Sequence, residues 1–190
     1  MSAGSGFVLL LKRAHEIAGY NPAGNMTSPA NSERSAEIFE RLLGEWSFVR
    51  EVPDKATMTG HARILATAEG RARYDETARV RLADGTTLTG SQSYYYRQLP
   101  PPASGFDVLF AENEELFERL NFRLSTDGSL RAEAEHHCPP DRYVSQFTLD
   151  RDDRLFVEHA VQGPHKNYVV RTVYRRVSRA PARDRSKSHQ

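Results

Sequence analysis

The sequence predicts an all-β domain, a closed up-and-down antiparallel β-barrel of about ten strands with a short N-terminal helix. Short runs of residues alternate between apolar and polar, most regularly from Arg71 to Leu82, as in strands with one buried and one solvated face. Turn signals, including Asp84-Gly85 and Asp127-Gly128, separate these runs at the spacing of consecutive hairpins. Closure would remove the exposed edges of an open sheet, and a two-sheet sandwich is the structural alternative.

The chain has 190 residues and is expected to hold one domain with a tail at each end. Residues 1–31 are interpreted as a leader and linker, residues 32–177 as a helix plus the barrel, and residues 178–190 as a basic disordered tail. The leader includes a predicted amphipathic helix near residues 7–18. The helix before the barrel is predicted over about residues 33–43, because Ser32 or Asn31 can cap its start and Gly44 suits its end. Its apolar stripe consists of Ile38, Phe39, Leu42 and Leu43.

Each strand is predicted from a short alternating run bounded by turn-forming residues. Pro100, Pro101 and Pro102 interrupt the chain after the fourth run, because proline cannot donate to a strand ladder. The predicted strands begin near Glu45, Thr57, Arg71, Thr86, Gly105, Glu115, Ser129, Asp141, Arg154 and Asn167.

Charge and cysteine content argue against several classes of function. The formal net charge is +1, which does not indicate a surface for nucleic acid. A single cysteine, Cys138, excludes an internal disulfide, and no apolar run has the roughly 18 residues of a membrane span. An intracellular, cytoplasmic location is therefore expected. A mitochondrial presequence is the alternative, because the apolar run 7–11 precedes Lys12 and Arg13, although Glu16 weakens that interpretation.

Two carboxylates stand where the alternation predicts apolar, inward side chains: Glu76 in the third predicted strand and Glu118 in the sixth. The inward positions predicted around Glu118 are Leu116, Leu120, Phe122 and Leu124. The run from Asp141 places Tyr143, Ser145, Phe147 and Leu149 on its inward face. A buried acid must be paired, hydrogen-bonded or protonated, so each is either a structural anchor or a working group. The same parity argument turns further polar side chains inward, although a bulge would reverse any one assignment. The predicted polar interior comprises Tyr74, Glu76, Tyr94, Tyr96, Glu118, His136, Cys138, Tyr143 and His159. Each also has an ordinary structural role as a hydrogen-bonded or space-filling core residue.

Several motifs carry a family resemblance. The segment Leu43-Gly44-Glu45-Trp46, a helix followed by G-x-W, resembles the opening of lipocalin-like barrels. Tyr74-x-Glu76, His136-x-Cys138-x-x-Asp141-x-Tyr143 and the segment from Gly163 to Tyr168 are similar to an uncharacterised lipocalin-like (calycin) family of unknown function. The resemblance covers roughly Leu42 to Arg176 and implies a lipocalin-like barrel but no reaction. The sequence departs from the family pattern at Glu118, His159, His165 and Asn167.

Three functions are consistent with these observations. The first is a barrel that binds a small hydrophobic or partly polar molecule in a polar lumen. The second is a non-catalytic accessory or scaffold subunit that contacts a protein partner through its N-terminal helix and C-terminal tail. The third is an acid–base enzyme of isomerase or cyclase type, with Glu118 or His136 as base and Tyr143 or Tyr94 as proton donor. The residues predicted to contact a ligand are Tyr74, Glu76, Tyr94, Tyr96, Glu118, His136, Cys138, Tyr143, His159 and Lys166.

No cofactor is predicted. His136, His159 and Glu118 form a two-histidine, one-carboxylate set of the kind that binds a divalent metal, but they lie on separate predicted strands without ligand spacing. A haem held by one inward histidine is a second alternative without a motif to support it.

Overall fold

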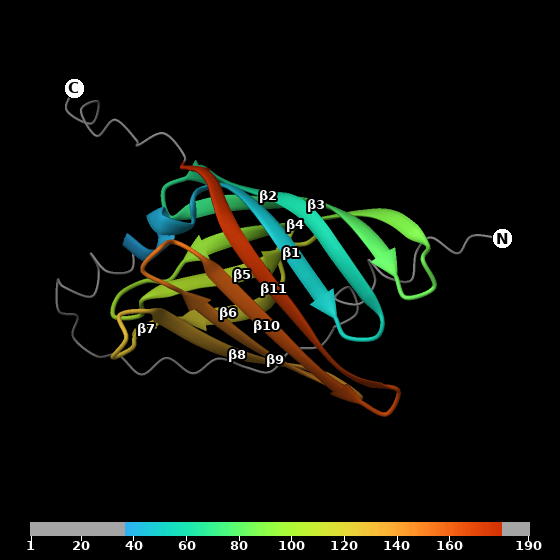
Figure 1. Ribbon diagram of the computed structural model, residues 1–190. Helices are drawn as coiled ribbons and strands as arrows, with labels where there is room; N and C mark the ends of the chain where they lie inside the picture. Colours follow the sequence, from blue (N-terminus) through green and yellow to red (C-terminus); the bar gives the residue numbers. More distant parts are fainter. Residues whose placement is uncertain (1–36, 180–190) are drawn as a thin grey trace, which may run out of the picture.

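The computed structural model describes residues 37–179, apart from the side chains of Cys138 and Arg179, and within this range the fold is an antiparallel, nearly closed barrel with one small helix (Figure 1). The all-β prediction is therefore confirmed. The described part of the helix spans residues 37–42. The strands are β1 (Gly44–Val52), β2 (Ala56–Ala68), β3 (Arg71–Leu82), β4 (Thr87–Gln98), β5 (Gly105–Phe110), β6 (Leu116–Asn121), β7 (Arg123–Leu124), β8 (Leu130–Cys138), β9 (Asp141–Leu149), β10 (Leu155–Gly163) and β11 (Lys166–Arg179).

The sheet follows chain order almost throughout. Its order is β6-β5-β4-β3-β2-β1-β11-β10-β9-β8-β7, so β1 pairs with both β2 and β11 and thereby joins the two halves of the chain. The end strands β6 and β7 are separated only by Phe122, and β6 also lies against β8. The chain itself therefore crosses from one edge of the sheet to the other at the point of closure.

The predicted strands agree closely with the observed ones. All ten begin within one residue of the predicted start, and both Asp-Gly turns are present, with positive φ angles of 88° at Gly85 and 77° at Gly128. An eleventh strand, β7, was not predicted, because two residues are too few to show an alternation.

The inward and outward faces were predicted correctly in β3 but not throughout β6. In β3 the burial pattern alternates as expected from Ala72 to Val80. In β6, Phe117 is buried, whereas Leu116, predicted to face inward, is 47% exposed. The pairing with β5 shifts between Val108 and Leu109, which is a bulge of the kind that reverses strand parity. Leu124, also predicted inward, is exposed in the short strand β7.

One end of the barrel is closed by the helix (Figure 1). Ile38, Phe39, Leu42 and Leu43 are all buried, as the apolar stripe predicted, although Leu43 itself lies after the helix. Trp46 is 1% exposed, and its indole Nε1 donates to the Leu42 carbonyl at 3.0 Å. The predicted start of this helix and the helix predicted near residues 7–18 lie outside the described residues.

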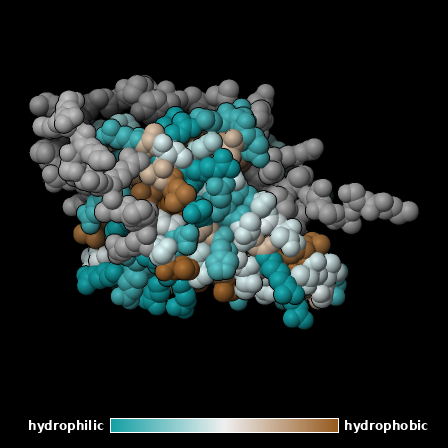
Figure 2. Space-filling view, turned by 90° about the horizontal axis from the view of Figure 1, so that it is seen from above, coloured by the Kyte–Doolittle hydropathy of each residue, from teal (hydrophilic) through white to brown (hydrophobic). Residues whose placement is uncertain are grey.

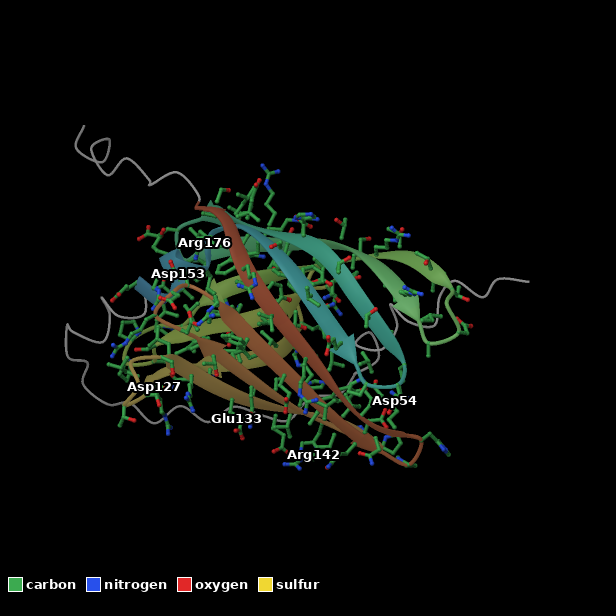
Figure 3. The ribbon with its side chains drawn as sticks, viewed as in Figure 1. Asp54, Asp127, Glu133, Arg142, Asp153 and Arg176 are labelled. Carbon is green, nitrogen blue, oxygen red and sulfur yellow. The ribbon has the colours of Figure 1, made fainter. Side chains whose placement is uncertain are left out.

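An arginine holds this closed end together from β11. The Arg176 guanidinium lies 4.1 Å from the centre of the Trp46 ring and donates to the carbonyls of Leu43 and Arg41. Figure 3 shows Arg176 and Asp153 close together at this end, where their charged atoms are 3.7 Å apart. Arg41 also binds Asp153, so one carboxylate connects the helix to β11.

Each exposed large apolar side chain within residues 37–179 lies on a different strand. Within residues 37–179, no helix is long and apolar enough to cross a membrane. On the face shown in Figure 2, polar residues prevail and the apolar ones form separate small patches. The large apolar residues that are exposed are Val49, Leu65, Leu116, Leu124, Phe156 and Val177.

Leu42→Ala should test the role of the helix in closing the barrel. Leu42 is 2% exposed, and removing its side chain leaves a void under Trp46, which should lower the free energy of unfolding by about 2–5 kcal/mol. Glu40→Ala, an exposed position on the same helix, is the matched control and should change it little. Urea unfolding measures both, and equal effects would show that the helix does not contribute to the core.

Candidate functional site

A cavity runs along the interior of the barrel, from Leu42 and Trp46 at the helix end to Gly90 and Tyr168 towards the opposite hairpins. Its volume is about 160 Å³. Engineered cavities of roughly 150 Å³ bind benzene, so this space accepts a molecule of about one ring. Of the predicted ligand contacts, those that line the cavity are Tyr74, Glu76, Tyr94, Tyr96, Glu118 and His159.

One wall of the cavity is aromatic. Tyr96 of β4 stacks on Phe106 of β5 with ring centroids 4.7 Å apart, and Tyr74 of β3 stacks on Tyr96 at 5.7 Å. Tyr94 stacks on Phe117 at 5.8 Å, which carries the contact across to β6. Because successive inward positions of neighbouring strands lie side by side, the alternation seen in the sequence produces this wall directly.

A buried ion pair in the cavity lining joins β1 to β3, which lie on either side of β2. Arg50 donates to both Glu76 oxygens, from Nη1 to Oε1 at 2.7 Å and from Nη2 to Oε2 at 2.8 Å. The same guanidinium donates to the Thr172 hydroxyl at 2.9 Å and to the Tyr174 hydroxyl at 3.1 Å, and Tyr74 donates to Glu76. This bidentate, fully hydrogen-bonded geometry is the arrangement in which a buried charge pair is tolerated.

Arg50 was missed as a site residue in the sequence, although its position shows a signal. It occupies the inward face of β1 together with Trp46, Phe48 and Val52. The alternation that turns acids, histidines and tyrosines inward in other strands therefore turns this arginine inward in β1.

A second polar cluster joins β6, β9 and β10. Ser145 of β9 is fully buried, and its hydroxyl donates to Oε1 of Glu118. The Ser145 hydroxyl oxygen also lies 2.7 Å from Nδ1 of His159. Glu118 and His159 are 3.9 Å apart, too far for a direct hydrogen bond, so Ser145 is the link between them. Ser145 was placed on the inward face from the sequence, but its connection to two other strands could not be read from parity.

Burial shifts both titratable groups of this cluster toward their neutral forms. It raises the pKa of Glu118 from 4.5 to about 7, against the opposing hydrogen bond from Ser145. It lowers the pKa of His159 from 6.5 to about 4, and the positive charge of Arg50 contributes in the same direction. Near neutral pH, His159 is therefore uncharged while Glu118 exchanges between its two forms.

The remaining predicted contacts lie outside the cavity lining. His136 packs against Phe117 and Tyr143, and burial lowers its pKa, with the charge of His137 adding to this and a hydrogen bond to the Phe117 backbone opposing it. Its buried Nε2 has no hydrogen-bond partner among the described residues. Lys166 donates to Asp141 at 2.6 Å and to the Tyr143 hydroxyl at 3.2 Å, which ties β9 to the start of β11. The Cys138 side chain is not among those described.

The metal alternative finds no geometric support. In the described part of the chain, no group of three or more His, Cys, Asp or Glu side chains is arranged to hold a metal ion. His136, His159 and Glu118, the set considered from the sequence, do not form such a group, because Ser145 stands between Glu118 and His159 and His136 packs on aromatic rings.

Fold and site together define a β-barrel with an internal, mostly apolar cavity that has an aromatic wall and a few polar groups in its lining. The chain belongs to DUF6314, a family of unknown function, whose sequence profile matches residues 42–176. Among curated proteins, no sequence matches the chain.

Two solved structures illustrate the architecture. A redesigned β-barrel, mFAP0, bound to DFHBI is 14% identical over 72% of this chain and 99% of its own, with a TM-score of 0.35. The S-type phycobiliprotein lyase CPES from Guillardia theta is 12% identical over 73% of this chain and 89% of its own, with a TM-score of 0.42. At these low scores, the likeness carries no information about a ligand of this chain.

Glu76→Gln should destabilise the barrel more than Glu118→Gln at neutral pH. Removing the Glu76 carboxylate leaves the buried Arg50 cation without its counter-ion, which should lower the free energy of unfolding by about 3–5 kcal/mol. Glu118 is partly protonated at this pH, so an amide of the same shape should lower it by about 1 kcal/mol or less. Glu51→Gln, at an exposed position of β1, is the control. Equal losses in urea unfolding, or a larger loss for Glu118→Gln, would contradict this ranking.

The side chains of Glu118 and His159 should also contribute opposite pH dependences to the free energy of unfolding. Folding raises the Glu118 pKa, so the folded chain binds the extra proton and stability falls as pH rises from about 4.5 to 7. Folding lowers the His159 pKa, so the unfolded chain binds the extra proton and stability rises between about pH 4 and 6.5. In the unmodified chain the two contributions largely cancel where they overlap.

Single substitutions separate these contributions. Relative to the unmodified chain, Glu118→Gln should gain stability as pH rises from about 4.5 to 7. His159→Gln should lose stability, relative to the unmodified chain, as pH rises from about 4 to 6.5. Urea unfolding at a series of pH values measures both differences, and exposed acids drop out because all chains share them. Parallel pH profiles for all three chains would show that neither group titrates abnormally in the folded state.

Proposed function

We propose that the chain binds a small, planar, uncharged molecule in the cavity of the barrel. The observation that carries this proposal is the cavity of about 160 Å³, which has an aromatic wall and a few polar groups that converge on it. This combination of apolar surface and sparse, placed polar atoms is characteristic of small-molecule sites. The size corresponds to about one ring, with extension along the barrel axis towards Gly90 and Tyr168.

Electrostatics favour an uncharged ligand. The two fully charged groups of the lining, Arg50 and Glu76, neutralise each other through two hydrogen bonds. His159 is uncharged near neutral pH, so the lining offers no unpaired cation for an anionic ligand. Taking an anion out of water into this environment would carry a desolvation penalty that nothing in the described lining offsets. A cation would meet Glu118, whose neutral form is favoured by burial.

Polar groups in the lining remain able to orient a ligand. The Tyr168 hydroxyl is buried and has no hydrogen-bond partner within residues 37–179. His159 uses Nδ1 for Ser145, which leaves its Nε2 for a bound molecule. Gln92 also lines the cavity and carries both donor and acceptor atoms. A ligand with a carbonyl or hydroxyl group on a ring would satisfy several of these atoms.

The accessory-subunit and haem alternatives receive less support from the described residues. The accessory-subunit hypothesis depends on the two tails, which lie outside them. A haem is far larger than a cavity of about one ring, so the lining does not fit that cofactor.

Ala78→Leu should weaken ligand binding by filling part of the cavity. Ala78 lines the cavity and is 6% exposed, so a larger side chain there must project into the space that a ligand would take. The probe is the uncharged, planar, one-ring dye 4-dimethylaminobenzonitrile, whose fluorescence responds to an apolar environment. Its affinity, measured by fluorescence titration, should be at least about tenfold lower for the variant than for the unmodified chain, an effect of about 1.4 kcal/mol.

The matched control is Thr77→Leu, which adds the same side chain on the outward face of the same strand. It should leave dye binding unchanged. Native mass spectrometry of the chain purified from its own source would then identify the natural ligand as an adduct that is lost on denaturation. Unchanged dye binding in Ala78→Leu would place the binding surface outside the barrel and refute the proposal.

A further inference from the structure

We infer that His159, Ser145 and Glu118 form a proton relay, and that His159 Nε2 exchanges protons with the molecule bound in the cavity. The inference rests on the proposed function, because it needs a ligand in the lumen. It goes further by assigning a reaction class, the transfer of a proton between two positions of the same molecule. The substrate class is a small planar carbon acid, such as a ring carbonyl compound that can form an enol.

The hydrogen-bond geometry fixes the resting arrangement of protons. Ser145 has one hydroxyl proton and donates it to Glu118. The contact of 2.7 Å between the Ser145 hydroxyl and His159 Nδ1 must then be a hydrogen bond donated by Nδ1–H. In neutral imidazole the other nitrogen carries a lone pair, so Nε2 is a proton acceptor in this state. Ser145 is 0% exposed and does not line the cavity, so it is a relay group and not a nucleophile.

The relay lets His159 act as a base without becoming charged. When Nε2 takes a proton from a ligand carbon, the Nδ1 proton moves to Ser145 and the Ser145 proton moves to Glu118. The ligand becomes an enolate, Glu118 becomes a neutral acid, and His159 remains neutral with its proton on Nε2. Total charge and proton number are conserved. The reverse sequence at a neighbouring ligand position completes an isomerisation without any co-reactant.

Burial supports this route over direct protonation. The pKa of His159 is lowered to about 4 by burial, so an imidazolium is unfavourable and His159 alone would be a weak base. The pKa of Glu118 is raised to about 7, which matches the range in which acid–base catalysts work best. The proton therefore comes to rest on the group that accepts it more readily.

Few other titratable or charged groups face this cluster. Tyr94 and Tyr96 of β4 lie within electrostatic range of Glu118, and burial raises the pKa of both phenols above their ordinary value, so both stay neutral. His136 of β8 packs on the neighbouring Phe117, and its pKa is lowered, mainly by burial. On the other side, Arg50 of β1 acts on His159 and is paired with Glu76 of β3 beside Tyr74 and Tyr174. The pH dependence near neutrality is thus assigned to Glu118.

The first test needs no ligand, because the relay predicts a tautomer switch. Above the Glu118 pKa of about 7, nitrogen-15 NMR of labelled chain should show His159 protonated on Nδ1. Below it, protonated Glu118 donates to Ser145, Ser145 donates to Nδ1, and the proton should be found on Nε2. The switch should occur without formation of imidazolium and should disappear in Glu118→Gln. A tautomer that is unchanged across this range in the unmodified chain would overturn the relay.

The second test uses nitrobenzisoxazole, a planar carbon acid, as a probe of the base. Removal of its ring C–H proton leaves the electron pair to form the nitrile, the N–O bond breaks, and a cyanophenolate is released whose absorbance is followed. The unmodified chain should accelerate this reaction, with a rate that rises with pH through about 7. His159→Gln and Ser145→Ala should each reduce the rate by roughly 10²-fold or more.

Controls separate loss of the relay from loss of the fold or of binding. His61→Gln, at an exposed position of β2, should keep the full rate, and circular dichroism should show that every variant is folded. If the chain binds 4-dimethylaminobenzonitrile and nitrobenzisoxazole but gives no acceleration, or if His159→Gln keeps the rate, the relay is refuted while the binding function stands. If neither compound binds, the proposed function itself fails. A pH-dependent rate lost in both relay variants and kept in the control would establish the relay.

Discussion

Because β6 and β7 are the end strands of the sheet and only Phe122 separates them in the chain, the barrel closes where the backbone passes from one edge to the other. This closure brings β6 against β8. It also brings Glu118 of β6 to Ser145 of β9, two side chains that are 27 residues apart in the sequence and lie on opposite halves of the sheet order. The position of the second polar cluster therefore depends on closure, and an open sheet would leave both groups in water.

The two inward carboxylates show how the same residue type takes different roles in one lumen. Glu76 faces a guanidinium that offers two parallel donors, and Tyr74 donates a further hydrogen bond. Glu118 accepts a hydrogen bond from Ser145 and lies 3.9 Å from Nδ1 of the uncharged His159; no ion pair with a lysine or arginine is seen for it among residues 37–179. A charged partner keeps a buried acid ionised, whereas burial alone favours the protonated form. Glu76 therefore serves as the hydrogen-bonded structural partner of Arg50, and Glu118 as a group that can change its protonation state.

The sequence predicted much of the fold because its information is local. Strand starts and faces follow from alternation and turn residues, and β3 shows this most clearly. The bulge at Phe117 could not be predicted, since it depends on the register between β5 and β6. Glu118 and His159 were both identified as inward residues, but their connection through Ser145 depends on how distant strands meet. The inward position of Arg50 could be predicted from strand parity but was missed. The hydrogen bonds from Lys166 to Asp141 and Tyr143 could not be predicted, because they depend on the path of the β8–β9 and β10–β11 hairpins.

The energetics of Glu118 connect its position to its proposed chemistry. A rise of its pKa from 4.5 to about 7 means that burial disfavours the carboxylate by roughly 3 kcal/mol relative to water. An apolar residue at this position would avoid that destabilisation, so the acid does not contribute to stability as Glu76 does. The same destabilisation makes the anion a better proton acceptor, because protonation relieves it. Among the described contacts, Glu118 accepts a hydrogen bond only from Ser145, and the Ser145 oxygen also contacts His159 in the cavity wall. The proposed route of a proton from the lumen to Glu118 follows these two contacts.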